Sequence, residues 1–271
     1  MNKISASIVF YQTKLSDVEK IISTVLKNTS VALYVVDNSP GDEIGRFLGD
    51  KKLTYIHQPA NPGFGAAHNM AIREAMGSGA AYHFIINPDI ELNEDLFIPM
   101  VQYMEEHPDV GMMMPQVLNI DGTIQNLPKL LPHPIWIFRR KLRRFDPWGD
   151  QFMTSYELRN ANKDEILNVP ILSGCFTLLR LAAIREIGMY DENFFMYFED
   201  FDLSRRMHQK YKTIYYPMVS VVHGYEGGAN KNFKLFKIFI KSMITYFNKW
   251  GWFFDQERKH INQETLTQLP K

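Results

Sequence analysis

Along the first half of the chain, short runs of apolar, β-branched and aromatic residues alternate with segments whose apolar positions recur at helical spacing. This alternation is typical of βαβ units, in which parallel strands form a sheet and helices cover its faces. Ser16 followed by Glu19 forms a capping box that marks the first helix. We expect strands at about residues 5–11, 32–37, 53–57 and 82–86, with helices at about 17–27 and 66–76.

The regular alternation ends after a helix expected at about residues 93–107. The pair Asp121-Gly122 lies between β-compatible residues, which predicts a hairpin across residues 116–125. Residues 127–165 are rich in Pro and Arg with weak periodicity, so we expect an excursion or flap over the sheet. Beyond it, the pattern predicts strands at about 176–180, 213–216 and 220–223 and helices at about 181–187 and 200–210.

Two segments suggest contact with a partner. Residues 233–254 have the pattern of one amphipathic helix, with lysines on one face and aromatic residues on the other. Such a helix can lie among membrane headgroups, dock on the protein's own core or pair with a second subunit, and the pattern leaves these three open. Residues 139–144 hold five cations, which could meet acidic lipid or a lipid-linked pyrophosphate or simply form a solvated surface.

Composition narrows the classes of function. At 271 residues the chain can form one large domain, alone or with an appendage. Its 30 basic residues equal its 30 acidic ones, so the net charge gives no reason to expect nucleic acid as a partner. Cys175 is the only cysteine, which excludes an internal disulfide and fits a reducing compartment such as the cytosol. The apolar stretch 4–11 is too short for a signal peptide or a membrane span.

Polar residues follow the second and fourth expected strands. Asn87-Pro88-Asp89 follows the apolar run 82–86, and a carboxylate beside an amide at a strand end suits a divalent cation that also binds diphosphate oxygens. The alternative is an ordinary turn in which Asp89 caps the next element. Asp37-Asn38-Ser39 ends the second strand, where Asp37 could accept a hydrogen bond from a pyrimidine base or close an Asx turn.

A glycine-containing loop lies between the third strand and the next helix. It runs from Asn61 through Gly63 and Gly65 to Asn69 at the helix start. Free N–H groups and the helix dipole favour an anion at such a site, so a phosphate or ribose neighbour is plausible. The spacing matches neither the dinucleotide fingerprint nor the P-loop, and a plain tight turn is the alternative.

Three carboxylates occur within four residues, at Glu199, Asp200 and Asp202, beside an aromatic run. Carboxylates flanked by aromatic side chains can have a raised pKa, which suits the general base for a sugar hydroxyl. The alternative is charge that favours the first turn of a helix. His223 ends the last apolar run and could complete a metal site with Asp89, provided the fold brings the two strand ends together.

Taken in order, these segments resemble the family 2 glycosyltransferases of the GT-A fold, most closely a bacterial rhamnosyltransferase-like branch. The resemblance spans nearly the whole chain. It depends on the ordered combination of motifs rather than on any one of them. The motifs are Val36-Asp37-Asn38-Ser39, Asn61-Pro62-Gly63-Phe64-Gly65 with Asn69, Asn87-Pro88-Asp89, Ser173-Gly174-Cys175-Phe176, Phe198-Glu199-Asp200-Phe201-Asp202 and His223.

The resemblance implies a role for each candidate residue. The nucleotide-sugar donor would bind to Tyr11, Asp37, Asn38, Asn61, Gly63, Asn69, Asn87 and Asp89. Asp89 matches the last acid of the family's DXD motif, whereas Asn87 replaces the first acid, so one metal carboxylate is missing. His223 would be the second protein ligand of a divalent cation, Mg²⁺ or Mn²⁺. Asp200 would be the catalytic base, and Glu199 would orient the acceptor or that base.

The implied organisation is a GT-A domain at residues 1–230, a Rossmann-like, mostly parallel sheet flanked by helices, followed by a helical extension at 231–271. Residues 1–115 would bind the donor, and residues 116–230 would bind the acceptor and carry catalysis. The implied activity is inverting transfer of a deoxysugar, with L-rhamnose from dTDP-rhamnose as the expected donor, to a lipid-linked or oligosaccharide acceptor of bacterial O-antigen or capsule. Block 127–165 is expected to set acceptor specificity.

Several alternatives remain at this stage. A UDP-sugar such as UDP-galactofuranose is the competing donor, because thymine and uracil present the same edge to Asp37. A nucleotide-sugar or glycan binding module without catalysis is the alternative from another class. A cytoplasmic location, with contact to the inner face of the membrane, and a homodimer are compatible with the resemblance.

Overall fold

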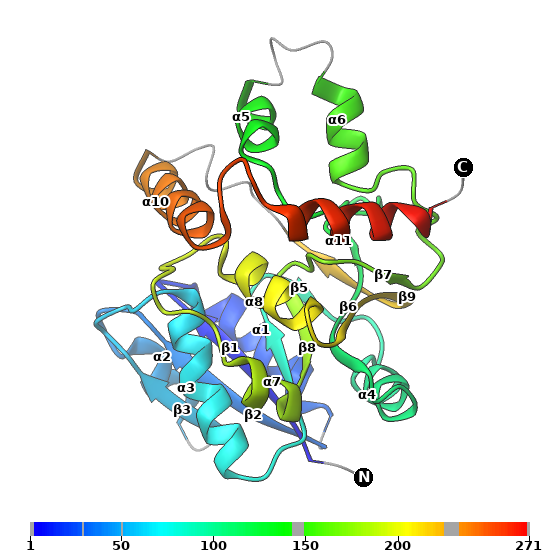
Figure 1. Ribbon diagram of the computed structural model, residues 1–271. Coiled ribbons are helices and arrows are strands. Elements are labelled where there is room, and N and C mark those ends of the chain that lie inside the picture. The colour runs from blue at the N-terminus through cyan, green and yellow to red at the C-terminus, as the bar shows by residue number, and fades with distance from the viewer. Residues whose placement is uncertain (1–2, 29, 50, 143–148, 225–232, 270–271) are drawn as a thin grey trace.

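The computed structural model describes residues 3–28, 30–49, 51–142, 149–224 and 233–269. Within them, one sheet forms the centre of the molecule and helices surround it (Figure 1). The strands, in spatial order, are β3 (Thr54–His57), β2 (Val31–Asp37), β1 (Ile4–Phe10), β4 (Tyr82–Ile86), β8 (Phe176–Arg180), β6 (Val110–Leu118), β9 (Lys212–His223) and β5 (Ile90–Glu91), while β7 (Leu167–Asn168) pairs with β9. The helices are α1 (Leu15–Leu26), α2 (Glu43–Leu48), α3 (Phe64–Gly77), α4 (Phe97–Glu106), α5 (Pro134–Leu142), α6 (Gly149–Tyr156), α7 (Leu181–Ile187), α8 (Glu199–His208), α10 (Phe233–Trp250) and α11 (Gln256–Thr267).

Strands β3, β2, β1 and β4 run parallel, as the sequence pattern predicted. β1 is buried at every position, because a central parallel strand is covered on both faces. Antiparallel β8 joins this half to β6 and β9, which are parallel to each other. The predicted α/β architecture with a mostly parallel sheet is therefore confirmed. One edge of the sheet collects the carboxyl ends of β1, β2, β4, β6 and β9 and the start of β8.

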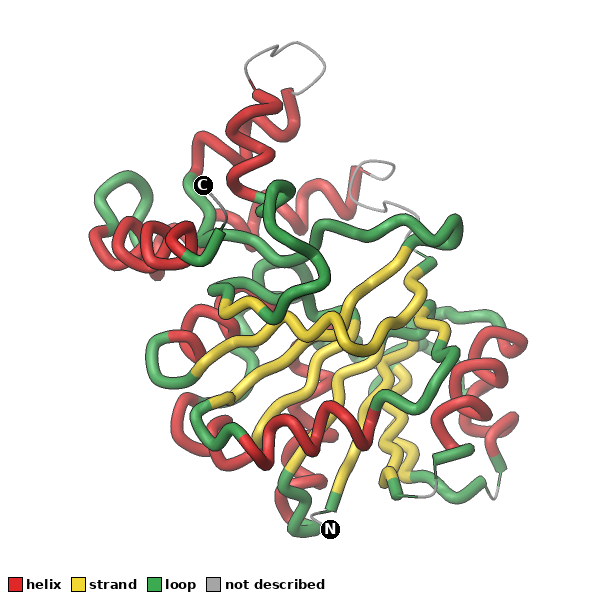
Figure 2. The backbone as a smooth tube through the Cα atoms, turned by 90° about the vertical axis from the view of Figure 1, so that its right-hand side faces the viewer, coloured by secondary structure: helices red, strands yellow, loops and turns green. Residues whose placement is uncertain are grey.

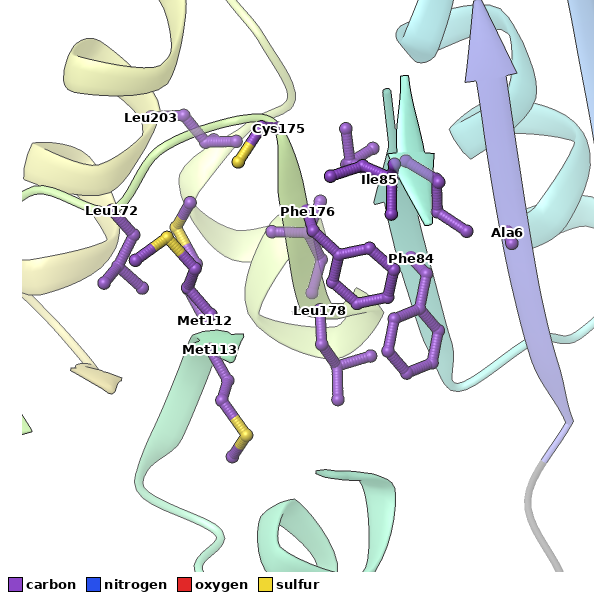
Figure 3. Close-up of a cluster of buried hydrophobic side chains, with 14 of the residues drawn as sticks. Ala6, Phe84, Ile85, Met112, Met113, Leu172, Cys175, Phe176, Leu178 and Leu203 are labelled. Atoms are coloured by element: carbon purple, nitrogen blue, oxygen red, sulfur yellow. The ribbon is translucent and has the colours of Figure 1, made fainter. Parts of the chain in front are cut away.

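The core is continuous across the junction between the two halves. Figure 3 shows Phe84 of β4 facing Phe176 of β8, and their ring centroids lie 5.7 Å apart. Met113 of β6 pairs with Leu178 of β8 and extends this apolar layer, whereas the preceding Met112 points to the opposite face of the sheet (Figure 3). All four side chains are fully buried. This packing fixes β8 between β4 and β6, so the loop before β8 is held at the edge where β4 ends.

The predicted capping box of the first helix is wrong. α1 begins at Leu15, and the N-terminal cap is Lys14, which makes no capping hydrogen bond through its side chain. The backbone N–H groups of Asp17 and Val18 both donate to the Lys14 carbonyl, which brings Ser16 inside the first turn. Helix α2, only six residues long, was not predicted because so short a segment shows no period.

Strand pairing in the second half differs from the prediction in three places. β6 was not predicted, and the two strands expected at 213–216 and 220–223 form one strand, β9. Pro115 pairs with Tyr216 and the next residue of β6 pairs with Ser220, so residues 217–219 bulge from the ladder. This bulge interrupts the alternation in the sequence. The hairpin expected around Asp121-Gly122 is present but short. Leu118 bridges to Ile124, and the N–H groups of Asn119 and Gln125 donate to the carbonyls of Thr123 and Val117 over 2.7 and 2.8 Å.

The excursion predicted at 127–165 contains a pair of helices, α5 and α6, which project away from the sheet on the side where β1 ends (Figures 1 and 2). Trp136 and the buried Tyr156 pack together at the base of the pair, with ring centroids 5.5 Å apart. Of the cationic run 139–144, the last two residues lie outside the described part of the chain.

The C-terminal extension consists of two helices instead of the predicted one. α10 buries Met243, Tyr246 and Phe247, and the last two contact the ring of Phe198. Its apolar face therefore docks on the protein's own core. α11 was not predicted because its sequence is polar and weakly amphipathic. Of the three alternatives for this segment, the central face of α10 therefore adopts the core-docked one. In the described residues we find no helix long and apolar enough to cross a membrane.

Candidate active site

Three chain segments meet at the carboxyl edge of the sheet: the turn after β4, the loop before β8 and the start of α8. The N–H of Asn87 donates to the carbonyl of Cys175 over 2.8 Å, and the N–H of Gly174 donates to Asp200 Oδ2 over 3.2 Å. Hydrogen bonds thus connect the Asp89 turn to the predicted base through residues 173–175.

Asp89 and His223 lie side by side, as a shared metal site requires. His223 Nε2 is 3.3 Å from Asp89 Oδ2, and His223 Nδ1 is 3.2 Å from Gln125 Oε1. The Asp89 side chain is 44% exposed and that of His223 only 7%. The carboxylate therefore reaches solvent, while the imidazole is buried and its other ring nitrogen contacts Gln125. Burial is the largest influence on Asp89 and opposes its ionisation, but the hydrogen bond and charge of His223, with hydrogen bonds from the backbone and Asn87, together lower the pKa of Asp89.

The residues around Asp89 suit a divalent cation that shares its ligands with a diphosphate. The side-chain oxygen of Asn87 is buried and has no hydrogen-bond partner within the described residues. A carboxylate, an amide oxygen and an imidazole are ligands that Mg²⁺ or Mn²⁺ accepts. In the described part of the chain, no three His, Cys, Asp or Glu side chains are arranged so that they could hold a metal ion together. An ion held here would therefore take much of its coordination from the diphosphate.

The end of β2 forms a buried polar corner. Asp37 is fully buried, and its two oxygens accept hydrogen bonds from the N–H of Ser39 at 2.9 Å and the hydroxyl of Tyr55 at 3.1 Å. The Asx turn, one of the two alternatives, is therefore present. Asn38 is 2% exposed, and its Oδ1 has no partner in the part of the chain that the structure covers. Tyr11 is exposed just beyond β1. Base binding by these residues stays a prediction.

The loop that leads into α3 makes a close backbone approach to the loop before α8. Asn61 and Gly63 have φ angles of 45° and 104°, and the N–H of Phe64 donates to the Phe195 carbonyl over 2.8 Å. A Cβ on Gly63 would collide with that carbonyl, so only glycine fits. Donor binding by Asn61 and Gly63 stays a prediction.

Asn69 fastens α3 to the same neighbouring loop. Its amide donates to the Tyr190 carbonyl over 2.9 Å and to Glu192 Oε1 over 3.0 Å, while its Oδ1 accepts from the N–H of Tyr190 over 3.0 Å. The side chain is 1% exposed. The predicted influence of Asn69 on the donor sugar would therefore act through the position of this loop.

Asp200 is held by backbone donors at the start of α8. The N–H groups of Gly174 and Phe201 donate to its two oxygens, at 3.2 and 2.9 Å. The two residues before the helix, Tyr197 and Phe198, have φ angles of 69° and 64°. Such left-handed conformations in bulky residues are strained and occur mainly at functional sites, where the surrounding packing maintains them.

Glu199 and Asp200 differ in how well their charges are compensated. Burial, followed by the charge of Asp200, raises the pKa of Glu199 well above its usual value, and Glu199 Oε2 has no partner in the described structure. Burial also raises the pKa of Asp200, but the Gly174 N–H and the charge of Lys129 oppose this effect. Of the pair, Asp200 is therefore the more readily ionised, which is the division expected of an acid and base pair.

Two side chains near Asp200 were not singled out as candidates from the sequence. Lys129 is only 7% exposed, and its Nζ donates to the Leu127 carbonyl over 3.0 Å. A lysine between prolines in an irregular segment gives no sequence signal of burial. Cys175 lies between the two acidic sites, where burial raises the pKa of its thiol to about 12.

The third acid of the cluster is structural. Asp202 is fully buried, accepts hydrogen bonds from Trp250 Nε1 at 2.9 Å and Arg206 Nε at 2.8 Å, and pairs with Lys249 at 2.8 Å. It ties α8 to the end of α10. The cluster therefore contains a candidate catalytic pair, Glu199 and Asp200, and a structural acid, Asp202, which sequence spacing alone did not separate.

Comparisons with known proteins agree with this geometry. The family model described as glycosyl transferase family 2 matches residues 5–188. An N-acetylglucosaminyl-diphospho-decaprenol L-rhamnosyltransferase of Mycobacterium tuberculosis is 26% identical over 200 residues, which are 69% of this chain and 62% of that protein. The low-salt glycan biosynthesis hexosyltransferase Agl10 of Haloferax volcanii is 23% identical over 210 residues, 76% of this chain and 62% of that protein. The chain thus spans about six tenths of the length of these relatives.

Solved structures share the fold at low identity. GalNAc-T7 with UDP, GalNAc and Mn²⁺ superposes with a TM-score of 0.60 at 15% identity, over 90% of this chain and 48% of that one. The mannosyltransferase PcManGT of Pyrobaculum calidifontis, with GDP-Man and Mn²⁺, gives 0.56 at 15% identity, over 84% of this chain and 58% of that one. The predicted GT-A fold is confirmed. Because the family model covers more than half of the chain and the fold agrees, this protein belongs to glycosyl transferase family 2.

Proposed function

We propose that the protein is an inverting, metal-dependent glycosyltransferase in which Asp200 is the catalytic base. The observation that supports this most directly is the pair at the start of α8. Asp200 receives two backbone N–H groups, whereas the neighbouring Glu199 is buried and its Oε2 has no partner among the described residues. Residues 173–175 join this pair to the Asp89 turn, so the proposed base and the proposed diphosphate site would lie at the same sheet edge.

In the proposed reaction, Asp200 removes the proton from an acceptor hydroxyl as that oxygen attacks the anomeric carbon. A single displacement from the face opposite the leaving group inverts the configuration and needs no covalent intermediate. Asp89 and His223 would hold a divalent cation, which supplies charge stabilisation to the departing nucleoside diphosphate. Protonated Glu199 would donate a hydrogen bond and so orient the acceptor or Asp200.

For the donor we propose dTDP-L-rhamnose. The support is the relative from Mycobacterium tuberculosis, whose name states an L-rhamnosyl transfer, at 26% identity. A UDP-sugar such as UDP-galactofuranose is the alternative, because the base edge that Asp37 and Asn38 would meet is the same in thymine and uracil. The acceptor would be a glycan, free or lipid-linked, of a bacterial surface polysaccharide such as O-antigen or capsule. The reaction would take place in the cytoplasm, at the inner membrane face.

Calorimetric titration with dTDP, UDP, GDP and CDP, each with and without Mn²⁺ or Mg²⁺, tests the donor site. We expect metal-dependent binding of dTDP that is lost in Asp89→Ala and kept in Glu91→Ala, a matched acid nearby on β5 that pairs with Lys20. Preference for UDP would indicate that the donor is a UDP-sugar and not dTDP-L-rhamnose. Absence of binding by all four nucleotides would contradict the proposed function.

A binding module without catalysis is the second candidate. Asp200→Asn separates the two, because removal of a general base costs about 10²- to 10⁴-fold in turnover without touching the nucleotide site. A transferase should lose sugar transfer and keep its affinity for dTDP. A binding module would give no transfer in the unchanged protein either.

A further inference from the structure

The turn between α10 and α11 exposes two aromatic side chains. Phe253 is 61% exposed and Phe254 is 95% exposed. Beside them lies a hollow of about 400 Å³ with an apolar floor, lined by Trp136 of α5 and Leu266 of α11, among other residues. Two adjacent exposed phenylalanines next to an apolar hollow are unusual on a soluble surface and indicate a contact.

The turn is rigid. Arg258 is 5% exposed, and its guanidinium donates to the carbonyls of Pro132 at 3.3 Å, Trp252 at 3.2 Å and Phe253 at 3.2 Å. A buried arginine that binds successive carbonyls fixes the backbone of the turn. The two phenylalanines are therefore held outward, and they would lose little conformational freedom on binding.

The charge around the turn is positive. The acids Asp255 and Glu257 are engaged by Arg205, at 2.8 and 2.7 Å, and Asp255 is 4% exposed. The exposed Lys259 lines the hollow, and α5, whose Trp136 also lines it, carries Arg139. An apolar tip with basic residues around it complements a surface of acidic headgroups over acyl chains.

The turn is coupled to the catalytic end of α8. Phe201, next to Asp200, packs on Leu131 and Ile261, and Leu131 is bonded through its N–H to Asn262 of α11 over 2.7 Å. From Lys129, whose charge acts on Asp200, the chain reaches the hollow at His133 in four residues, or at most about 14 Å. A membrane at the turn would present the head of a lipid-linked acceptor near Asp200.

We propose that Phe253 and Phe254, together with Lys259 of α11 and Arg139 of α5, dock this protein on the surface of an anionic lipid bilayer. This inference deepens the proposed function, since it gives the transferase an acceptor presented at the membrane. The docking element is the rigid turn between the helices, which differs from the α10 face that the sequence pattern suggested.

The test is flotation of the full chain with phosphatidylcholine vesicles that contain about 30% phosphatidylglycerol, compared with pure phosphatidylcholine. We expect binding to the anionic vesicles that weakens with salt. The double variant Phe253→Ser/Phe254→Ser should bind at least about tenfold more weakly. Met218→Ser, which removes a 55% exposed apolar side chain on β9, should bind as the unchanged protein does.

Three outcomes would overturn the inference: no binding to anionic vesicles, equal binding by the double variant, or equal binding to neutral vesicles. A fourth is self-association of the unchanged protein that the double variant abolishes, since a second copy would then cover the turn. Binding to vesicles needs no donor, so retained dTDP affinity in a protein that fails flotation would reject only this inference. The same affinity and the urea midpoint of unfolding verify that the variants fold.

Discussion

Acidification should destabilise this protein through two histidines buried between β1, β4 and α3. His83 of β4 is fully buried between Ser5 and Ser7 of β1, with its ring nitrogens 2.8 and 2.7 Å from their hydroxyls. Burial lowers the pKa of His83 from 6.5 to about 3. His68 of α3 joins the same network through Ser7 at 2.7 Å, and burial also lowers its pKa.

The sign and the size of the effect follow from proton linkage. Below pH 6.5 the unfolded chain binds a proton at His83, whereas the folded chain remains neutral there until about pH 3, so stability falls as the pH falls between these values. At about 1.4 kcal/mol per pH unit, His83 alone should cost about 2 kcal/mol of unfolding free energy between pH 7 and pH 5.

Urea unfolding at pH 7, 6 and 5 at constant ionic strength measures this loss. His83→Gln should be less stable at pH 7 but lose about 2 kcal/mol less than the unchanged protein on going to pH 5. His260→Gln is the matched control, because His260 is 73% exposed, and it should keep the original pH dependence. An unchanged slope in His83→Gln, or an NMR titration of the His83 ring near pH 6.5 in the unchanged protein, would refute this reasoning.

Three further predictions concern the site and its support. Glu199→Gln should keep most of the transfer rate at neutral pH, because a protonated Glu199 resembles glutamine. Asp200→Asn should lose about 10²- to 10⁴-fold. Equal losses in steady-state assays would show that Glu199 acts as a carboxylate. Gly63→Ala should destabilise the fold and weaken dTDP binding, whereas Gly77→Ala, where a Cβ meets open space, should do neither; thermal melts and calorimetry compare them. Arg205→Met should cost about 3 kcal/mol in urea unfolding, because the buried Asp255 would lose its ion pair at 2.8 Å and keep only the Arg258 guanidinium at 3.8 Å and the Arg258 N–H. A loss below about 1 kcal/mol would contradict that view of the network.

The sequence predicted the elements whose pattern is set by local burial. β4, β8 and α7 have the expected bounds, because each is a continuous apolar run or a short amphipathic helix between clear breaks. β9 was split in the prediction because the bulge at 217–219 breaks its alternation, and β6 was missed because its methionines have no strong preference for strands. Pairing of β6 with β9 depends on residues about 100 positions apart, which no local pattern reports.

For the site, the sequence located the candidate carboxylates but not how their surroundings divide the roles. Asp200 and Asp202 are two residues apart and look alike in the chain, yet one receives backbone N–H groups at the sheet edge and the other pairs with α10. Lys129 was not singled out, because its burial beside Asp200 arises only when the irregular segment folds back over residue Ile171. Tertiary packing, not local sequence, determines which of these groups can ionise.

Cys175 gives the protein a built-in reporter for the motions of its own site. Its carbonyl accepts the hydrogen bond from the turn that carries Asp89, and the preceding residue donates to Asp200. The thiol therefore lies at the junction between the Asp89 turn and the start of α8. A buried thiol with a pKa of about 12 reacts with alkylating reagents only when the Asp89 turn and the start of α8 move apart and expose it. Because it is the only cysteine, its alkylation rate measures the opening frequency of the site in the unlabelled, unmutated protein. A nucleotide that holds these two segments together would slow the alkylation of Cys175 by the same factor as it lowers the frequency of opening.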